Sequence, residues 1–413
     1  MDRPPLALDE SASSGPIAPV KGGSVITGAF LIAGTSIGAG MLALPFKTGV
    51  AGLLPAFAVS ALTWLYMLAT GLLLLEATLW MPEGANLLSM SRRLLGKGGF
   101  FITGAAFLFL YTCLLVAYYA GGVPLFQESI EGLFKISLGH GISTFLFTLL
   151  FGGIVFLGAR ATSRLNFILM WALILSYFAL VGTLGSEVKS TNLERREWPL
   201  ALAAIPTLFS AYGYHNMVPS LVTYLERNTR KLKVAIVIGT SIPFIVYTLW
   251  EWVVIGALSK GAIVETLAQG EVITASFHTL PKGAWIAAAG RLFSLFAITT
   301  SILGVGLSMV DFLGDGTKIK RTGKGRLLLT SLVFLPPVLF TSISPGLFFA
   351  ALHYAGGFGE ALLNGLMPAL FVYVGRYRLK LVSKDPLPGG KLLLLGLMAI
   401  ASFIFIHELI ALL

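Results

Sequence analysis

The sequence predicts an all-α polytopic membrane protein that crosses the bilayer eleven times, and three observations carry this prediction. The 413 residues are 56% hydrophobic and only 12% charged, which lies far from the composition of soluble domains. The apolar stretches recur along the whole chain, and most approach the roughly 20 residues that a helix needs to cross the hydrocarbon core. Glycine and proline interrupt the first and the sixth of these stretches at corresponding places.

The predicted spans follow one another with short polar connections. The first 23 residues, rich in Ser, Pro, Gly and Ala, predict a flexible tail before them. The segment 260–282 is too polar to span and predicts a short lid or connector on the outer face. Whether the count is eleven, or ten or twelve, depends on the connection SISPG at 342–346. We place the spans at 24–47, 52–80, 100–122, 141–159, 165–185, 200–225, 234–258, 284–311, 326–342, 346–374 and 391–412.

The basic residues predict the orientation in the membrane. If the N-terminus is cytoplasmic, the tail and the loops after the even-numbered spans hold 21 of the 29 Lys and Arg residues. The positive-inside rule favours this arrangement, which leaves the C-terminus on the periplasmic side. The same loops account for the formal net charge of +10, so the expected partner is the lipid membrane and not nucleic acid.

Known catalytic and metal-binding motifs are missing from the sequence. There is no HExxH or GxSxG motif, and GTSIGAG lacks the Gly-Lys-Ser/Thr ending of a phosphate-binding loop. The single cysteine, Cys113, can form neither an intramolecular disulfide nor a thiolate cluster. We therefore expect no enzyme activity, no cofactor and no metal site. A channel is the remaining class besides a carrier, because glycine-broken helices also line pores.

The first interrupted span contains the stretch LIAGTSIGAGM at residues 31–41. Each glycine inside a helix costs about 1 kcal/mol relative to alanine. Unwound backbone survives in a membrane only where protein or a water-filled cavity satisfies its N–H and C=O groups, so the stretch suggests a binding site. Gly34 and Gly38 also have the GxxxG spacing of a close helix contact, and this span alone leaves both interpretations open.

The sixth span, IPTLFSAYGYHNMVPSLVTYL at 205–225, is interrupted in a similar way. Pro206 and Pro219 flank a polar centre around Gly213. Span 1 enters from the cytoplasm and span 6 from outside, so two five-span units of opposite topology each begin with a broken helix. Such a pattern points to a transporter site at the membrane midplane. The units are residues 24–185 and 200–374, and 391–412 is an additional span.

The inner ends of a broken helix can bind charged groups. Half-helix N-termini present N–H groups to an anion, and half-helix C-termini present carbonyls to a cation. An α-amino acid carries both charges a few ångströms apart. We expect amides near Thr35, Gly38 and Gly40 to hold a carboxylate. Carbonyls near Phe209, Ser210 and Tyr212 are expected to hold an ammonium group.

Four segments carry a family resemblance that runs through most of the chain in one order. They are GAFLIAGTSIGAGMLALP (28–45), IPTLFSAYGYHNMVPSLVTYL (205–225), KLKVAIVIGTSIPFIVYTLWEWVVIG (231–256) and ILGVGLSMVDFLGDG (302–316). Together they resemble the bacterial aromatic amino acid permeases, the tyrosine and tryptophan branch of the hydroxy and aromatic amino acid permease family. The resemblance implies a proton-driven importer of tyrosine, tryptophan or phenylalanine in the inner membrane. It also implies the LeuT-like five-plus-five inverted repeat of the amino acid, polyamine and organocation superfamily, with one extra C-terminal span.

Tyrosine is the expected substrate, and tryptophan or a hydroxy amino acid are the alternatives. Where the family tends to have Phe-Gly-Phe-His, this chain has Tyr212, Gly213, Tyr214 and His215. The extra hydroxyls could bind a phenol or could only contact water. Aromatic selectivity also needs an apolar pocket, to which two tyrosines two turns apart on span 3 could contribute. The expected substrate-binding residues are Ala33, Gly34, Thr35, Ser36, Gly38, Gly40, Tyr111, Tyr118, Phe209, Ser210, Tyr212, Gly213, Tyr214, His215 and Asn216.

Polar residues at membrane depth are the candidates for coupling and gating. Glu251 and Arg291 lie at matched depth, which predicts an ion pair that is either structural or part of proton coupling. His215 suits proton exchange, with a structural histidine as the alternative. Thr300 and Ser301 leave sodium coupling open, although such hydroxyls often bond only their own helix.

Other polar residues in the spans receive less specific expectations. Residues of span 10 are expected to be polar helix contacts or gate residues. Acidic residues near the cytoplasmic ends of spans 2 and 8 form gating ion pairs or solvated helix ends. No role follows for His407 and Glu408. The span 10 residues are His353, Glu360 and Asn364, and the acidic ones are Glu76, Asp311 and Asp315.

Overall fold

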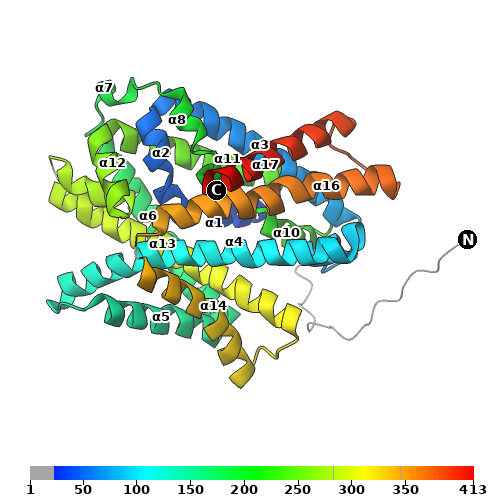
Figure 1. The fold of residues 1–413 in the computed structure, drawn as a ribbon, viewed down its shortest axis with the longest axis horizontal. Helices are drawn as coiled ribbons and strands as arrows, with labels where there is room; N and C mark the ends of the chain where they lie inside the picture. The colour runs from blue at the N-terminus through cyan, green and yellow to red at the C-terminus, as the bar shows by residue number, and fades with distance from the viewer. Residues whose placement is uncertain (1–22, 282, 345) are drawn as a thin grey trace, which may run out of the picture.

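A computed structural model describes residues 23–281, 283–344 and 346–413. Over these residues the chain folds into helices and turns, without strands. The long helices run mostly along the long axis of the molecule (Figure 1). The predicted tail, apart from its last residue, lies outside the described residues.

Nine of the described helices are long and apolar enough to cross a membrane. A tenth span is the bent pair Val25–Ser36 and Ala39–Ala51. The predicted sixth span consists of two seven-residue helices, so the count of eleven stays a prediction. The nine are α3 (Leu53–Leu79), α4 (Leu87–Phe134), α5 (His140–Leu157), α6 (Ala159–Gly185), α11 (Thr229–Ala257), α13 (Gly283–Thr317), α14 (Gly323–Ile343), the continuous segment Phe348–Arg378 and α17 (Gly390–Leu412).

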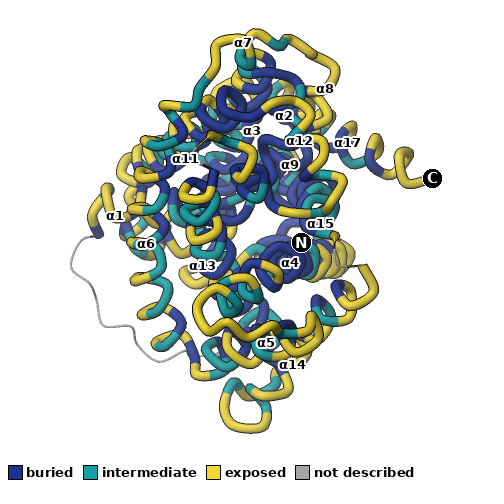
Figure 2. The backbone as a smooth tube through the Cα atoms, turned by 90° about the vertical axis from the view of Figure 1, so that its left-hand side faces the viewer, coloured by how far each residue is buried: buried dark blue, intermediate teal, exposed yellow. Residues whose placement is uncertain are grey.

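The segment Phe348–Arg378 is the most internal of these spans, with 72% of its apolar window buried, followed by α13 with 61%. It runs through α15 (Phe348–Tyr354), the π-helical η4 (Ala355–Leu366), α16 (Met367–Tyr373) and the π-helical η5 (Val374–Arg378). In contrast, α6 and α17 bury 22% and 28% and lie at the periphery. Figure 2 shows the same gradient from a buried centre to an exposed rim. The exposed large apolar side chains of the rim suit contact with lipid tails.

The third span is longer than the sequence suggested, because α4 begins at Leu87 rather than near residue 100. Asn86 caps its start by accepting a hydrogen bond from the Ser89 amide, and the Ser89 side chain accepts one in return. Gly96 interrupts the helix with a positive φ of 77°, a conformation that glycine adopts without strain. The polar first turns therefore form a separate helical segment, which continues into the span across a kink at Gly96.

The predicted connector after α11 does not span the membrane. It forms α12 (Lys260–Gln269) and the short 3-10 helix η3 (Ile273–Thr279). α12 packs against α2 (Leu44–Ala51), and η3 packs against α13. A second connector, between α6 and the sixth span, forms α7 (Ser190–Leu193) and α8 (Trp198–Leu202).

Ion pairs join the helix ends on one side of the molecule. Glu76 at the end of α3 receives two hydrogen bonds from Arg376, at 2.7 and 2.5 Å, and one from Ser383 at 2.6 Å. Arg321 pairs with Asp311 and Asp315. The three acidic residues are therefore paired, and Glu76 is also buried.

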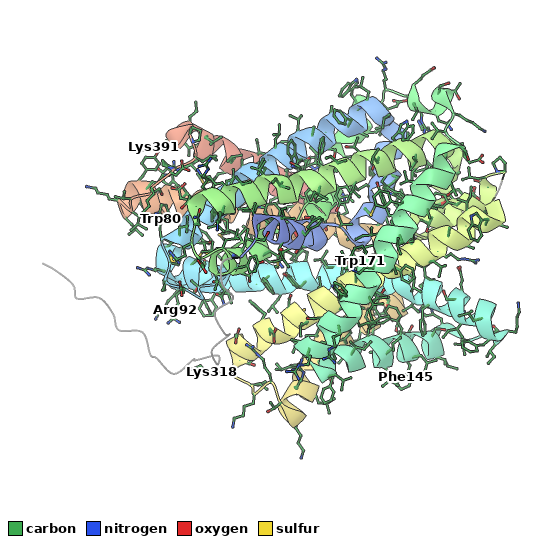
Figure 3. All side chains as sticks on the ribbon, turned by 180° about the vertical axis from the view of Figure 1, so that it is seen from behind. Trp80, Arg92, Phe145, Trp171, Lys318 and Lys391 are labelled. Atoms are coloured by element: carbon green, nitrogen blue, oxygen red, sulfur yellow. The ribbon has the colours of Figure 1, made fainter. Side chains whose placement is uncertain are left out.

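Basic residues from three predicted cytoplasmic connections lie towards one end of the molecule. Figure 3 shows Arg92, Lys318 and Lys391 there, with Phe145 towards the other end. These three basic residues thus lie towards the same end of the long axis, as the positive-inside pattern requires.

Candidate functional site

The first span breaks where the sequence places its glycines. α1 (Val25–Ser36) ends at Ser36, Ile37 and Gly38 are extended, and the chain resumes as the 3-10 helix η1 (Ala39–Leu42) and then α2. The two halves are bent by 46°. The sixth span breaks between α9 (Ile205–Ala211) and α10 (Val218–Tyr224), with the 3-10 helix η2 (His215–Met217) between them.

The two breaks lie against each other. A Cβ added to Gly40 would approach the Cα of Ala211 to 3.1 Å, which is tighter than ordinary contacts. The hydroxyl of Ser36 also donates to the carbonyl of Gly213 at 3.4 Å. Glycine at position 40 thus lets the two backbones approach closely. Of the GxxxG pair, Gly38 also makes a close helix contact, because a Cβ there would lie 2.3 Å from the Ser301 hydroxyl of α13, whereas Gly34 makes none. A Cβ at Gly34 would meet only Met170, at 3.6 Å.

Two side chains of α11 satisfy carbonyls that the breaks leave free. The Tyr247 hydroxyl lies 2.6 Å from the Ser36 carbonyl and 3.0 Å from the Ala211 carbonyl. The Trp250 indole donates to the Met41 carbonyl at 3.0 Å. Unwound backbone at this depth needs such partners. Tyr247 therefore fixes the position of one break relative to the other.

The substitution Tyr247→Phe is expected to lower both stability and substrate affinity. It leaves two buried carbonyls without this donor, which costs about 1–3 kcal/mol. Tyr177→Phe is the matched control, because the Tyr177 hydroxyl also donates to a carbonyl, that of Val246, at 2.8 Å, but away from the breaks. Melting temperature and equilibrium binding on purified protein test this. We expect both variants to melt earlier and only Tyr247→Phe to bind more weakly; equal affinities would contradict the role of Tyr247.

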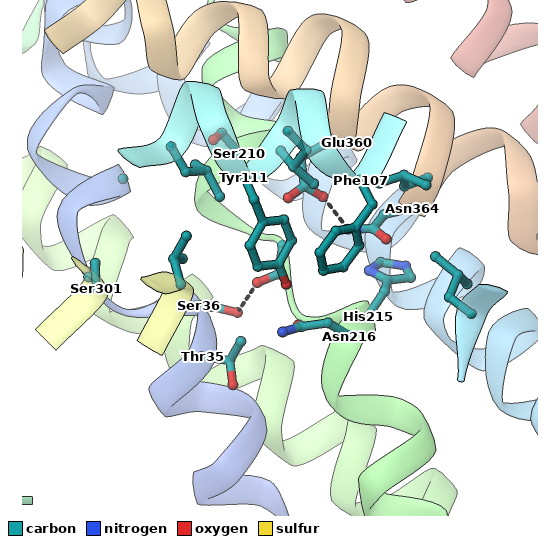
Figure 4. Close-up of a pocket in the computed structure, with 18 of the residues that line it drawn as sticks. Thr35, Ser36, Phe107, Tyr111, Ser210, His215, Asn216, Ser301, Glu360 and Asn364 are labelled. Atoms are coloured by element: carbon teal, nitrogen blue, oxygen red, sulfur yellow. Dashed lines mark hydrogen bonds between the residues drawn. The ribbon is translucent and has the colours of Figure 1, made fainter. Parts of the chain in front are cut away.

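A cavity of about 310 Å³ opens between the two breaks. This volume lies at the lower end of the roughly 300–1,000 Å³ of small-molecule sites. Figure 4 shows side chains from the two broken spans, α4, α13 and η4 around it. The cavity extends past Ser220 and Thr223 of α10 to Gly84 and Leu87, between α3 and α4. That is the end at which the basic loops gather.

One wall of the cavity is aromatic and comes from α4. The rings of Phe107 and Tyr111 stack at 4.0 Å, and Phe107 also stacks on Phe312 at 4.1 Å. Tyr118 lies two turns further along and lines the cavity as well. Tyr111 and Tyr118 therefore both line the cavity, as their predicted position on one face of the helix suggested.

Hydroxyl and amide groups also line the cavity. The Ser301 hydroxyl accepts a hydrogen bond from the Ala39 amide at 3.0 Å and donates to the Ala297 carbonyl at 2.9 Å. The Ser210 hydroxyl is buried and has no hydrogen-bond partner among the described residues. Ser210 thus brings an unpartnered hydroxyl to the lining of the cavity.

Glu360 is the one acidic residue among the described residues that line the cavity. The Asn364 amide, four residues later on η4, donates to its carboxylate. The carboxylate also lies against the second break, because a Cβ added to Gly213 would come within 2.6 Å of it. The residue is only 4% exposed.

The structure brings together residues that the sequence could only propose separately. Those at the cavity come from both breaks, α4 and α13, and their role in binding stays a prediction. Ala33, Gly34, Phe209 and Thr300 do not line it. The residues that do are Thr35, Ser36, Gly38, Gly40, Tyr111, Tyr118, Ser210, Gly213, His215, Asn216 and Ser301.

The hydroxyls of Tyr212 and Tyr214 point away from the cavity, into α3. Tyr212 bonds the Ser60 hydroxyl at 2.7 Å, and Tyr214 donates to the Met67 carbonyl at 3.1 Å. Both expectations for them, a phenol partner or water, are therefore wrong. Sequence periodicity could not show this, because the break at Gly213 rotates the two rings out of helical register.

The predicted ion pair between Glu251 and Arg291 is also wrong. Arg291 lies 3.4 Å from Glu128 of α4 and is about half exposed. Glu251 is buried on α11, and its oxygens have no hydrogen-bond partner among the described residues within normal geometry. The two residues share a depth but face different helices, and a sequence determines depth more closely than rotation about the helix axis.

The other coupling candidates, Thr300, Ser301 and His215, differ in whether their side chains reach the cavity. Thr300 donates to the carbonyls of Phe296 and Ala297 on its own helix, as the alternative interpretation expected, and only Ser301 reaches the cavity. The His215 ring lies 3.0 Å from the Thr70 hydroxyl.

Three of the cavity residues that the sequence left outside the expected site bear on its chemistry. Glu360 and Asn364 were expected only as helix contacts or gate residues, and their spacing of four in an apolar, glycine-rich span was the available signal. Phe107 carried no signal, because it is one of 29 phenylalanines. Nearer the start of the same span, His353 lies 2.9 Å from Glu408 of α17, which gives that carboxylate a partner.

Known proteins share both the sequence and the fold. Residues 21–408 match the tryptophan/tyrosine permease family. The Haemophilus influenzae tryptophan-specific transport protein is 31% identical over 87% of this chain and 89% of its own. The tyrosine-specific transport system 1 of the same organism is 32% identical over 79% and 82%.

The fold is similar to that of MhsT, crystallised in complex with L-phenylalanine. The TM-score is 0.66, over 94% of this chain and 98% of that one, at 16% sequence identity. MhsT has the LeuT fold, so the predicted fold class of an all-α polytopic membrane protein with broken first and sixth spans is confirmed. The family match covers nearly the whole chain and includes both breaks and the cavity between them. The chain belongs to the tryptophan/tyrosine permease family.

Proposed function

We propose that this protein imports an aromatic amino acid, tyrosine first, by proton symport across the bacterial inner membrane. The observation that carries the proposal is the cavity between two broken helices, which is lined both by aromatic rings of α4 and by hydroxyl and amide groups. The names of the family and of the relatives support an aromatic substrate. A zwitterion with an aromatic ring matches both kinds of lining.

The substrate would lie with its charged groups at the breaks and its ring along α4. The amides around Gly38 and Gly40 favour the carboxylate, because they begin the second half of span 1. The Ala39 amide between them already donates to the Ser301 hydroxyl. The carboxylate would therefore bind the amides on either side of Ala39. The ring would stack near Phe107 and Tyr111.

Tyrosine is favoured on the polarity of the cavity rather than on Tyr212 and Tyr214. A phenol can both donate and accept a hydrogen bond, and the Ser210 hydroxyl and the Asn216 amide line the cavity. An indole offers only a donor. Tryptophan is the second candidate, since three of the relatives are named tryptophan-specific.

The proposed topology follows the charge distribution along the molecule. The basic end, at which the cavity reaches Gly84, would face the cytoplasm. The N-terminus would then be cytoplasmic and the C-terminus periplasmic. The described conformation would be open toward the cytoplasm, one of the two states of alternating access.

Counterflow in proteoliposomes tests the carrier function. We expect labelled tyrosine to enter vesicles preloaded with unlabelled L-tyrosine, with saturation and with preference over the D-enantiomer. Unsaturable conductance would instead indicate a pore. Replacing sodium by choline is expected to leave uptake unchanged, whereas a protonophore is expected to abolish accumulation; the reverse result would make the protein sodium-coupled.

A further inference from the structure

Resting on the proposed function, we propose that Glu360 is the group that takes up the coupled proton, and that it does so when the substrate fills the cavity. The position of the carboxylate carries this inference. It is buried, it lines the substrate cavity, and it lies against the backbone of the second break at Gly213. No other acidic side chain among the described residues lines this cavity.

The hydration of the carboxylate changes with the occupancy of the cavity. Glu360 lines the cavity although it is only 4% exposed, so in the empty cavity water can contact it on that side alone, and the Asn364 amide donates one hydrogen bond to its carboxylate. A carboxylate stripped of water in an apolar environment is costly unless it is paired. An aromatic substrate displaces that water, so its binding favours the neutral, protonated form of Glu360.

Coupling follows from this linkage. If substrate binding favours protonation, then protonation favours substrate binding by the same factor. The carrier moves loaded with both ligands, and it releases the proton when the substrate leaves and water returns. The proton comes from the solution on one side and leaves to the solution on the other, so the carboxylate is regenerated in each cycle.

The surroundings of Glu360 contain no cation, among the residues that the structure describes, that would hold it ionised. His215, which also lines the cavity, bonds Thr70 through Nε2, and its Nδ1 has no hydrogen-bond partner among the described residues. Glu408 of α17 contacts Gly357 and is bonded to His353. From α9 only the Ser210 hydroxyl faces the cavity. The phenols on the elements packed against η4 are Tyr111, Tyr118 and Tyr119 of α4, Tyr66 of α3, Tyr354 of α15 and Tyr373 of α16. Glu76 of α3 is paired with Arg376, and His407 of α17 is exposed. The other titratable groups of these elements are Arg92, Arg93 and Lys97 in the first turns of α4, Cys113 in its middle, Glu128 and Glu131 near its end, and Lys391 at the start of α17.

Glu251 provides a matched control for this assignment. It is a glutamate buried in a membrane helix to a similar extent, 5% exposed, but it does not line the cavity. Substituting either residue by glutamine preserves shape and removes the titration. A difference in tyrosine binding between the two variants therefore reflects the place of Glu360 at the cavity. The loss of a buried carboxylate is common to both variants and cannot cause such a difference.

The experiment measures tyrosine affinity against pH on purified full-length protein. For the unmodified protein and for Glu251→Gln, affinity is expected to rise as pH falls, by at most about tenfold per pH unit if one proton is taken up, and to level off once the carboxylate is already protonated in the empty cavity. Glu360→Gln is expected to bind with an affinity that does not depend on pH. In proteoliposomes it should still exchange tyrosine but should not accumulate it under a proton gradient.

A second measurement does not depend on a variant that folds. A pH indicator in weakly buffered solution should report proton uptake when tyrosine is added to the unmodified protein. No proton uptake, or a Glu360→Gln variant that keeps the pH dependence and the accumulation, would overturn the inference and leave the proposed function standing. If no aromatic amino acid binds the unmodified protein, the proposed function fails and the inference fails with it.

Discussion

The substitution Gly356→Ala is expected to eliminate folded, transport-competent protein. Gly356 lies where η4 crosses α9, and an added Cβ would come within 1.6 Å of the Pro206 carbonyl oxygen and 2.6 Å of its carbon. Both atoms belong to the backbone, so no side chain can move aside. Overpacking of a well-packed interior costs about 1–3 kcal/mol or more, and here the two elements that frame the cavity must separate.

Gly182→Ala on α6 is the matched control, because a Cβ there meets no atom within 4 Å. Both are glycines in membrane helices, and alanine is the better helix former at either position. The amount of monodisperse protein after detergent extraction, measured by size-exclusion chromatography, separates the variants. Equal yields and equal uptake would show that η4 and α9 are not packed as described.

The substitution Gly38→Ala is expected to reduce tyrosine uptake by about five- to 150-fold, through its contact with α13. Gly38 is extended, with φ of −177°, so alanine causes no backbone strain there. Its Cβ would, however, lie 2.3 Å from the Ser301 hydroxyl oxygen, which holds the Ala39 amide. Displacing that hydroxyl leaves a buried amide unpaired, which costs about 1–3 kcal/mol, and about 1.36 kcal/mol corresponds to a tenfold change.

Ser301→Ala in the same background tests that mechanism by a double-mutant cycle. Ser301→Ala alone is expected to reduce uptake, because the Ala39 amide loses its acceptor. Once the hydroxyl is gone, Gly38→Ala should add little further loss, so the double variant should be less impaired than the two single effects combined. Independent, fully additive losses would contradict the contact between the first break and α13.

The sequence was sufficient to predict the breaks because their cause is local. Glycines such as Gly38 and Gly40 cannot be explained inside a lipid-facing helix, and the polar centre around Gly213 repeats the pattern in the second half. The polar connector after α11 and the long apolar helices follow from composition in the same way. These features depend on what each segment contains and not on its neighbours.

Contacts between helices could not be predicted with the same success. The ion pair expected for Arg291 forms with Glu128 instead, because depth in the membrane leaves rotation about the helix axis undetermined. The hydroxyls of Tyr212 and Tyr214 were misplaced because an irregular break has no periodicity to extrapolate. Glu360 was recognised as polar, but only the packing of η4 on α9 brings it to the cavity.

The measurement that tests the central claim most directly is competition for labelled L-tyrosine bound to the purified protein. Unlabelled tyrosine, tryptophan, phenylalanine and serine would each be tested as the competitor. The account predicts displacement by the aromatic amino acids, with tyrosine the most effective, and little displacement by serine, which cannot fill the cavity between Phe107 and the two breaks. Displacement by serine at concentrations as low as those of tyrosine would contradict an aromatic amino acid site.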